Sequence, residues 1–347
     1  MNLADFDYPL PRSAIAQAPA DARDGSRLLR IDRRTRQLTD HSFSALPGLL
    51  RPGDCVVVND SRVIPARLLA HDVAGRAVEL LFVEPAPDES QQERRWRALV
   101  RPGRRGRPGA ELRADEGIRL RVVAVEADGA RVVERLDGEI LDALERHGVP
   151  PLPPYIAHHA KPGHDDRERY QTVYAAAPGS VAAPTAGLHF TPALLDGLRD
   201  RGIEVHALTL HVGPATFRPI KTPRVEDHVL TSERVVIPES VAAAVSVARA
   251  ERRRVVAVGT TTVRALESAA AADGVVRAMR GRADLFIRPG HRFRIVDALL
   301  TNFHLPRSSL LVLVCAFADR DLILAAYGHA LAAGYRFYSY GDATFVE

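Results

Sequence analysis

A glycine followed by three threonines stands between a predicted strand and a predicted helix. The apolar run at 255–258 predicts the strand, and Gly259, Thr260, Thr261 and Thr262 come directly after it. Ligands of α/β proteins bind at the carboxyl ends of strands, where helix N-termini offer free N–H groups and a positive dipole end. The turn therefore predicts a site for a carboxylate or a phosphate. The alternative is a threonine N-cap on an ordinary helix. The sequence contains no G-x-G-x-x-G or G-K-[ST] pattern, which disfavours nucleoside triphosphate chemistry.

Groups able to transfer a proton occur in three further segments. His189 precedes a predicted helix at 192–201, His304 belongs to the segment Thr301-Asn302-Phe303-His304, and Asp342 follows Tyr340-Gly341. Asp297 lies between a predicted strand at 284–287 and the segment that contains Asn302 and His304. An acid, an amide and an imidazole near one strand end suit proton transfer and substrate orientation. The alternatives are a structural role for each histidine and a simple turn for Asp342.

The pattern of metal-ligating residue types argues against a bound metal. The histidines show no i, i+4 pairing with a carboxylate, which is the spacing typical of a helical zinc site. The two cysteines, Cys55 and Cys315, lie in apolar runs far apart in the chain. They are expected to be buried, inert thiols, and no metal site is predicted.

A run of arginines marks a second candidate surface. The segment 94–107 holds seven arginines and no acidic residue, among them Arg101, Arg104 and Arg105. The chain has a formal net charge of +4 and a pI of about 9.3. These charges are compatible with contacts to RNA phosphates. A solvated charged loop is the alternative.

The order of apolar segments predicts two domains of different class. A buried strand at 54–58 is followed by five short strands within 66–136, a charged helix at 138–147 and a proline-rich linker at 149–154. Helices and strands then alternate to a last predicted strand at 335–340. This pattern predicts an α/β fold: a layered, mostly parallel sheet flanked by helices, with a small β-barrel inserted in it. The domains would be 1–66 with 151–347, and 67–150.

Composition limits the class and the location of the protein. Apolar residues make up 46% of the chain and charged residues 26%, which is ordinary for a globular protein. The sequence has no apolar run long enough for a membrane span, and its acidic start lacks the features of a signal peptide. A cytoplasmic location is expected.

The chain resembles the S-adenosylmethionine:tRNA ribosyltransferase-isomerases of queuosine biosynthesis nearly from end to end. The resemblance is carried by long ordered motifs: Phe6-Asp7-Tyr8-Pro9-Leu10-Pro11, Asn59-Asp60-Ser61-Arg62-Val63-Ile64-Pro65-Ala66-Arg67, Pro184-Thr185-Ala186-Gly187-Leu188-His189-Phe190, His211-Val212-Gly213-Pro214-Ala215-Thr216-Phe217, Val258-Gly259-Thr260-Thr261-Thr262, Thr301-Asn302-Phe303-His304-Leu305-Pro306 and Tyr338-Ser339-Tyr340-Gly341-Asp342-Ala343. Ser61, Tyr338 and Thr344 depart from the residues usual in the family, and 75–135 matches only loosely.

The resemblance implies an α/β domain interrupted by a small β-barrel, and an unusual reaction. The ribosyl part of S-adenosylmethionine would move to 7-aminomethyl-7-deazaguanine at the tRNA wobble position, giving epoxyqueuosine and releasing adenine and methionine. S-adenosylmethionine would be a cosubstrate, with no bound cofactor and no metal. The partner would be a tRNA anticodon stem-loop, and a monomer is expected.

Residue type and motif membership then give three sets of candidate site residues. The candidate catalytic residues are His189, Asp297, His304 and Asp342. The candidate cosubstrate ligands are Thr185, Gly187, Gly259, Thr260, Thr261, Thr262, Arg264 and Asn302. The candidate tRNA contacts are Asp60, Arg62, Arg67, Arg101, Arg104 and Arg105.

Two other functional classes are weighed against this one. A non-catalytic RNA-binding protein would use the basic barrel alone and would leave the polar segments near the predicted strand ends without a role. An S-adenosylmethionine-dependent methyltransferase would carry a glycine-rich loop after an early strand and an acidic residue ending the next strand. The sequence shows no such arrangement.

Overall fold

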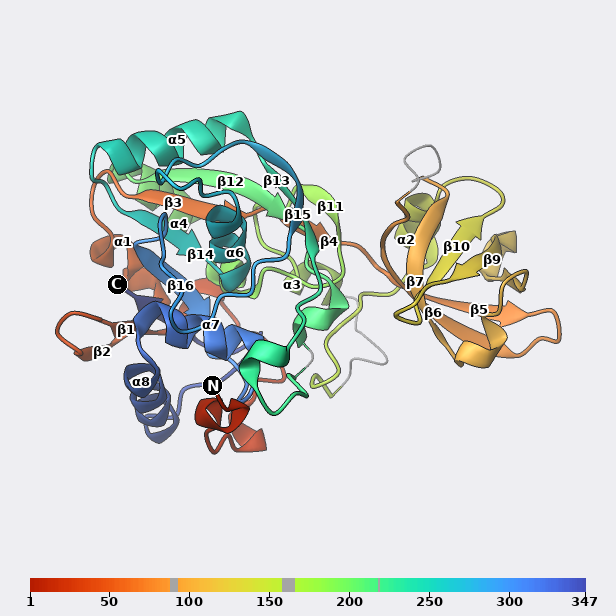
Figure 1. Cartoon of the computed structure of the whole chain (residues 1–347), viewed down its shortest axis with the longest axis horizontal. Coiled ribbons are helices and arrows are strands. Elements are labelled where there is room, and N and C mark those ends of the chain that lie inside the picture. The colour runs from red at the N-terminus through yellow and green to blue at the C-terminus, as the bar shows by residue number, and fades with distance from the viewer. Residues whose placement is uncertain (88–92, 158–165, 218) are drawn as a thin grey trace. The chain divides into compact units, whose positions relative to one another are not determined.

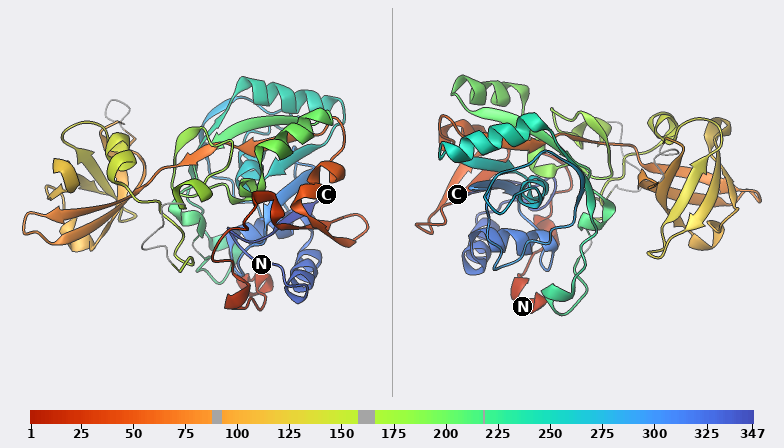
Figure 2. Two further views of the ribbon diagram at one scale, coloured as in Figure 1. Left: turned by 180° about the vertical axis from the view of Figure 1, so that it is seen from behind. Right: turned by 45° about the horizontal axis from the view of Figure 1, so that its top comes forward.

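A computed structural model describes residues 1–87, 93–157, 166–217 and 219–347. They form two compact units (Figures 1 and 2). Each unit has its own hydrophobic core. One unit comprises Met1–Ser61, Gln171–Ala177 and Ala183–Glu347, and the other comprises Arg62–Tyr170 and Pro178–Ala182. The first contains a large sheet with flanking helices and the second a closed β-barrel, which confirms the predicted fold class.

In the described residues, nine strands of the α/β unit form one sheet in the order β15-β13-β12-β3-β14-β16-β17-β1-β2. Their bounds are β1 Arg27–Ile31, β2 Leu38–Ser42, β3 Cys55–Asn59, β12 Glu204–Leu210, β13 Glu233–Ile237, β14 Val255–Val258, β15 Met279–Ala283, β16 Ala298–Asn302 and β17 Ala343–Val346. The four central strands β12, β3, β14 and β16 are mutually parallel, and β17 runs antiparallel to β16. A separate two-stranded sheet pairs β4 (Ser61–Val63) with β11 (Ala177–Ser180).

Helices bury the central strands on both faces. The helices of this unit are α1 Leu46–Leu49, α4 Pro192–Asp200, α5 Glu239–Ala250, α6 Thr260–Ser268, α7 Ser309–Ala318 and α8 Arg320–Ala332. One core joins Val56 and Val58 of β3 to Leu194 and Leu198 of α4. Cys55 and Val57 alternate with these valines and are also fully buried, and α5 and α6 contact β3 as well. Burial on both faces explains why these strands are continuous apolar runs rather than alternating ones.

The barrel closes through the order β10-β7-β6-β5-β8-β9, and all its neighbouring strands are antiparallel. The elements of this unit are β5 Arg67–Asp72, β6 Ala77–Pro85, β7 Arg95–Arg101, β8 Glu111–Arg113, β9 Arg119–Val125, β10 Arg131–Arg135, α2 Ile140–His147 and α3 Asp166–Arg169. Alternate residues point inward, among them Leu80, Phe82 and Trp96, and α2 packs Leu144 against the same core. The sequence predicted five of these strands. It missed β8, which is three residues long and carries a charge at either end.

Two predicted strands near the C-terminus are wrong. Residues 284–287 are not a strand, because the carbonyl of Leu285 accepts a hydrogen bond from the Arg264 side chain in place of a neighbouring strand. Residues 335–340 are not a strand either, since Tyr338 has a positive φ of 76° and turns the chain. The strands of this region are β16 and β17. Consequently Asp297 precedes a strand, and Asp342 precedes the antiparallel strand beside it.

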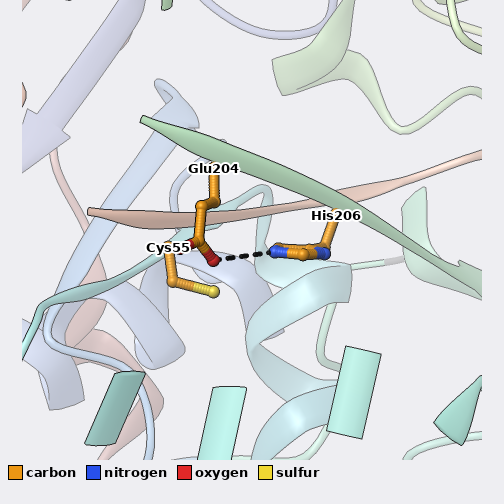
Figure 3. A group of neighbouring side chains, drawn as sticks. All are labelled: Cys55, Glu204 and His206. Atoms are coloured by element: carbon orange, nitrogen blue, oxygen red, sulfur yellow. Dashed lines mark hydrogen bonds and ion pairs between the residues drawn. The ribbon is translucent and has the colours of Figure 1, made fainter. Parts of the chain in front are cut away.

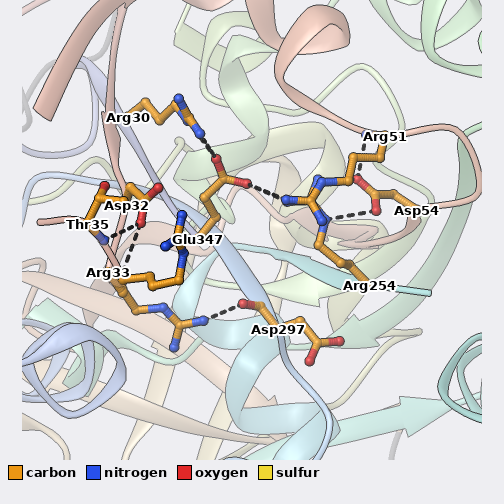
Figure 4. Close-up of polar contacts among 10 residues, drawn as sticks. Arg30, Asp32, Arg33, Thr35, Arg51, Asp54, Arg254, Asp297 and Glu347 are labelled. Atoms are coloured by element: carbon orange, nitrogen blue, oxygen red, sulfur yellow. Dashed lines mark hydrogen bonds and ion pairs between the residues drawn. The ribbon is translucent and has the colours of Figure 1, made fainter. Parts of the chain in front are cut away.

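At the amino ends of the central strands, a group of ion pairs ties the strands together (Figure 4). Arg254, just before β14, binds the Asp54 carboxylate with two hydrogen bonds of 2.6 and 3.0 Å and also binds the Glu347 carboxylate. Arg30 of β1 donates to Glu347 at 2.6 Å. The Asp54 and Glu347 side chains are only 2% and 9% exposed, so water screens these contacts weakly.

None of the described helices is long and apolar enough to cross a membrane.

We expect Arg254→Ala to lower the free energy of unfolding by about 3 to 5 kcal/mol, because it leaves the buried Asp54 carboxylate without its guanidinium partner and leaves Glu347 to Arg30. Urea unfolding followed by circular dichroism would measure the change. Arg320→Ala is the matched control, since Arg320 pairs with Asp321 at the surface and its loss is expected to change stability little. Equal stabilities of the two variants would contradict a structural role for this group.

Candidate functional site

A small pocket lies where β14 and β16 end, at the edge of the sheet opposite the ion pairs. Its walls come from the 3₁₀ turn Thr185–His189, the start of α6, the end of β16 and the segment at 338–339. The lining residues are Ala183, Pro184, Thr185, Ala186, Val212, Thr216, Gly259, Thr260, Thr261, Thr301, Asn302, His304, Leu310, Tyr338 and Ser339. Among the residues that the structure describes, no Asp, Glu, Lys or Arg lines it. The pocket is therefore rich in hydroxyls and free of fixed side-chain charge.

The N-terminus of α6 forms one wall of the pocket. Gly259 has φ 91° and ψ 149°, a conformation that L side chains rarely adopt, and its N–H donates to the carbonyl of Leu300 at 2.8 Å. This turn places Thr260 and Thr261, the first residues of the helix, in the lining of the pocket. The first N–H groups of a helix have no partner within the helix. Thr262 serves the helix instead, because its hydroxyl donates to the carbonyl of Val258 at 2.7 Å.

A chain of four side chains fixes the wall around Asn302. The Thr185 hydroxyl donates to the Asn302 amide oxygen at 3.1 Å, which turns the amide nitrogen toward His189 Nε2 at 3.2 Å. His189 Nδ1 then lies 2.8 Å from the Ser26 hydroxyl. The network assigns the proton of His189 to Nδ1, with Nε2 accepting from Asn302. Thr185 and Asn302 line the pocket, and His189 stands behind them.

Both buried histidines are neutral at physiological pH. Burial lowers the pKa of His189 to about 3, and the nearby charges of Arg336 and Arg23 contribute to the same shift. Burial alone lowers the pKa of His304 to about 3. His189 uses both ring nitrogens in hydrogen bonds, which makes it a positioning residue for Asn302. His304 lines the pocket itself, and its Nε2 lies 3.1 Å from the Thr301 hydroxyl.

Two tyrosines hold the backbone of His304 through hydrogen bonds. The Tyr8 hydroxyl donates to the His304 carbonyl at 2.5 Å, and the His304 N–H donates to the Tyr327 hydroxyl at 3.1 Å. Both rings lie in an aromatic cluster with Phe303 and Phe337. Packed rings have few alternative positions, so the imidazole is held on a rigid support.

Arg264 faces away from the pocket lining and forms a buried ion pair with Glu233 of β13. Its Nη1 donates to Glu233 Oε2 at 2.5 Å, and its remaining nitrogens donate to the carbonyls of Leu285 and Ala283. Both side chains are 5% exposed. The other oxygen of Glu233 accepts from the Gly213 N–H and from Thr216, which lines the pocket. Arg264 thus supports the pocket wall through Glu233.

Three other predicted site residues lie outside the pocket lining. Asp297 is at the opposite edge of the sheet, where it accepts from the Val255 N–H and pairs with Arg249. Asp342 accepts from the backbone N–H groups of Arg27 and Arg336, so it holds the chain next to β17 in place. Gly187 packs so close to Tyr174 that an added Cβ would lie 2.0 Å from its hydroxyl.

The candidate tRNA contacts belong to both units. In the α/β unit, Asp60 follows β3 and accepts from the Thr209 hydroxyl at 2.6 Å, and burial raises its pKa. In the barrel unit, Arg62 lies 3.7 Å from Glu145 and Arg67 lies 4.0 Å from Glu79. Arg101 and Arg104 are exposed, whereas Arg105 donates to the Ala77 carbonyl and lies 3.8 Å from Asp72.

Several residues of the site are absent from the predicted sets. Thr216, Tyr338 and Ser339 line the pocket, and Asn59 donates to Thr261 at 3.4 Å and to the Leu210 carbonyl at 2.9 Å. All four lie within the motifs that carry the family resemblance, and that membership was the available signal. Ser26 had the same signal, since Ser26-Arg27-Leu28-Leu29 is a further segment that resembles the family. Glu233 lacked it, because its partners Arg264, Gly213 and Thr216 are distant in sequence.

The two buried histidines predict a loss of stability in acid. Their unfolded pKa of 6.5 exceeds the folded value of about 3, so the unfolded chain binds more protons between these limits. Stability is therefore full above pH 6.5 and falls as the pH drops, by about 2 kcal/mol per histidine between pH 7 and pH 5. Urea unfolding at both pH values should show a smaller drop for His189→Gln than for the parent. His71→Gln, at an exposed position on β5, should keep the parental drop, and an unchanged drop in His189→Gln would contradict the burial argument.

This chain is similar to known proteins over nearly its whole length. The family model described as queuosine biosynthesis protein matches residues 3–346. A protein of Anaeromyxobacter dehalogenans is 52% identical over 345 residues, with 99% of this chain and 98% of that protein covered. One of Moorella thermoacetica is 49% identical over 350 residues, with both chains fully covered. Both are named S-adenosylmethionine:tRNA ribosyltransferase-isomerase.

The chain is also similar to a solved structure. The crystal structure of an S-adenosylmethionine tRNA ribosyltransferase from Thermotoga maritima is 34% identical, with a TM-score of 0.55 over 99% of this chain and 100% of that one. The family model and the relatives extend over both units and over every segment that lines the pocket. The chain therefore belongs to the queuosine biosynthesis protein family.

Proposed function

We propose that this protein is an S-adenosylmethionine:tRNA ribosyltransferase-isomerase, acting on 7-aminomethyl-7-deazaguanine at the wobble position of tRNA. The ribosyl part of S-adenosylmethionine moves to the modified base, and adenine and methionine leave. The observation that carries this proposal is the uncharged pocket at the N-terminus of α6, in a chain whose family match spans 3–346. S-adenosylmethionine has an anionic carboxylate and a cationic sulfonium, and the two ends of the pocket suit these groups differently.

The N-terminus of α6 suits the carboxylate. Its free N–H groups and the hydroxyls of Thr260 and Thr261 offer hydrogen bonds to an anion, and the helix dipole adds a favourable potential. Arg264 is not needed for direct contact, because Glu233 already holds its charge. Its role in this scheme is to keep Thr216 and the pocket wall in place through Glu233.

The rest of the pocket suits a sulfonium that must react. No described carboxylate lines the pocket, so the cation is desolvated there without being neutralised. Loss of hydration raises the free energy of the cation. It therefore makes the neighbouring C–H groups more acidic and favours steps that remove the positive charge from sulfur. His304 is the neutral imidazole in the lining, and we assign to it the contact with the reacting sugar. Asn302, held by Thr185 and His189, orients the sugar hydroxyls.

Product analysis tests the reaction. Incubation with S-adenosylmethionine and tRNA that carries 7-aminomethyl-7-deazaguanine should release adenine and methionine in equal amounts and leave epoxyqueuosine in the tRNA. Chromatography of the small molecules and of the digested tRNA measures all three products. S-adenosylhomocysteine would identify a methyltransferase, and tRNA binding without turnover would identify a binding protein. Either result would contradict the proposal.

A pair of variants should separate the two substrates. Thr261→Ala removes one hydroxyl from the anion site and should weaken S-adenosylmethionine binding about 10-fold or more, while tRNA affinity is unchanged. The double variant Arg101→Ala with Arg104→Ala should weaken tRNA binding and reduce its salt dependence by about 0.9 per lost phosphate contact or less, while S-adenosylmethionine affinity is unchanged. Calorimetry and filter binding at several salt concentrations measure the two affinities.

Each variant of that pair serves as a control for the other. A further control for the barrel is Arg119→Ala, since Arg119 pairs with Asp137 and contributes little net positive charge to the surface. Its tRNA affinity should stay near that of the parent. Parental tRNA affinity and salt dependence in the Arg101 and Arg104 double variant would instead make this run a solvated loop.

A further inference from the structure

Three side chains with different metal-binding atoms meet at the amino ends of β3 and β12 (Figure 3). They are Cys55, Glu204 and His206, and one ligand atom from each lies within 4.8 Å of the other two. Glu204 and His206 are two residues apart on β12, so they share a face of the strand. The parallel register sets Cys55 directly opposite Glu204 on β3. The backbone of the central sheet therefore fixes the arrangement.

One of the three residues is buried and the other two are accessible to solvent. Cys55 is 0% exposed, whereas the side chains of Glu204 and His206 are 43% and 26% exposed. An ion could reach the two outer ligands from solvent and then meet the buried sulfur. His206 Nε2 and Glu204 Oε2 already lie 3.2 Å apart. Zinc bonds of about 2.0 to 2.3 Å require ligand atoms about 3.5 Å apart, which small rotations of the outer side chains provide.

Arg253 orients the carboxylate without occupying the oxygen that faces His206. Its Nη1 donates to Glu204 Oε1 at 3.1 Å and to the Gly53 carbonyl at 2.7 Å, and its Nε donates to Glu251 at 2.6 Å. A metal bound through Oε2 leaves these contacts in place. Hydrogen bonds of this kind to a ligating carboxylate are typical around metal sites. The thiolate and the carboxylate together balance the charge of a divalent ion.

We propose that Cys55, Glu204 and His206 form a binding site for a divalent transition metal of zinc type, with a fourth position open to solvent. Sulfur, imidazole and carboxylate are all zinc ligands, and the thiolate favours zinc over magnesium or calcium. On binding, the Cys55 S–H bond breaks, a sulfur–metal bond forms and the proton passes to solvent. The site lies at the opposite edge of the sheet from the pocket, so it is independent of the proposed transfer reaction.

The buried thiol makes binding depend on proton displacement. Burial raises the pKa of Cys55 to about 12, with a further contribution from the charge of Glu204, so the sulfur is protonated at neutral pH. Metal binding must therefore release that proton. The histidine pattern considered in the sequence did not reveal this site, because its ligands follow strand spacing and come from two strands.

Metal binding is measured directly, without an activity assay. Titration of the full chain with Zn²⁺ against a chromophoric chelator should show one tight site, and Co²⁺ should give a near-ultraviolet sulfur-to-cobalt absorption band. Cys55→Ser should lose the band, and His206→Ala should weaken Zn²⁺ binding at least 10-fold. Cys315→Ser is the matched control, because Cys315 is also buried, in α7, and should keep both signals.

Each outcome of the titration decides the proposal. Absence of the cobalt band in the parent chain, or its persistence in Cys55→Ser, would overturn the assignment. His206→Ala guards against misfolding, since His206 is partly exposed and its replacement leaves the core intact. Parental Zn²⁺ affinity in a folded His206→Ala chain would also overturn it. The readout is binding, so failure here leaves the proposed transferase function unaffected.

Discussion

Burial of the central strands on both faces is the constraint on which the rest of the structure depends. Every residue of β3, β14 and β16 is buried, so polar groups can reach solvent or a ligand only where these strands end. The polar contacts differ between the two ends of these strands. The amino ends carry ion pairs around Arg254, and the carboxyl ends carry neutral hydrogen bonds around Asn302. Ion pairs stabilise one edge, and an uncharged pocket lies at the other.

The neutral edge depends on charges placed one layer behind it. Glu233 and Arg264 neutralise each other behind the wall of the pocket. Glu233 also accepts from Thr216 of that wall, and Arg264 also donates to the Ala283 carbonyl outside it. Asp342 acts similarly through two backbone N–H groups near the segment that carries Tyr338. The acidic residues of this region thus act mainly as supports. A pocket without its own charge can still be rigid, because ionic contacts outside it hold the chain.

The sequence predicted the parts that local patterns determine. Thr191 caps α4 with Pro192 at its first position, and Gly202 has the positive φ that ends it, so this helix was placed within one residue. The threonines after Gly259 were placed between a strand and a helix, and in the structure they are the first residues of α6, where two of them line the pocket. The pairing of strands that are distant in sequence could not be predicted from local patterns. The apolar run at 284–287 was therefore predicted as a strand, although it pairs with none. A left-handed tyrosine such as Tyr338 has no sequence signal, because non-glycine residues seldom adopt that backbone.

The large sheet remains open at both sides, and its outermost strands face the risk of pairing with another molecule. Arg280, Gly281 and Arg282 of the edge strand β15 are exposed, and Arg282 bonds to both the side chain and the carbonyl of Ser232. The guanidinium groups repel those of a second molecule, and glycine has a low strand propensity. Both oppose hydrogen bonding between the sheet edges of two molecules. Arginines placed on an edge strand are therefore expected to keep copies of this chain from joining through their sheet edges.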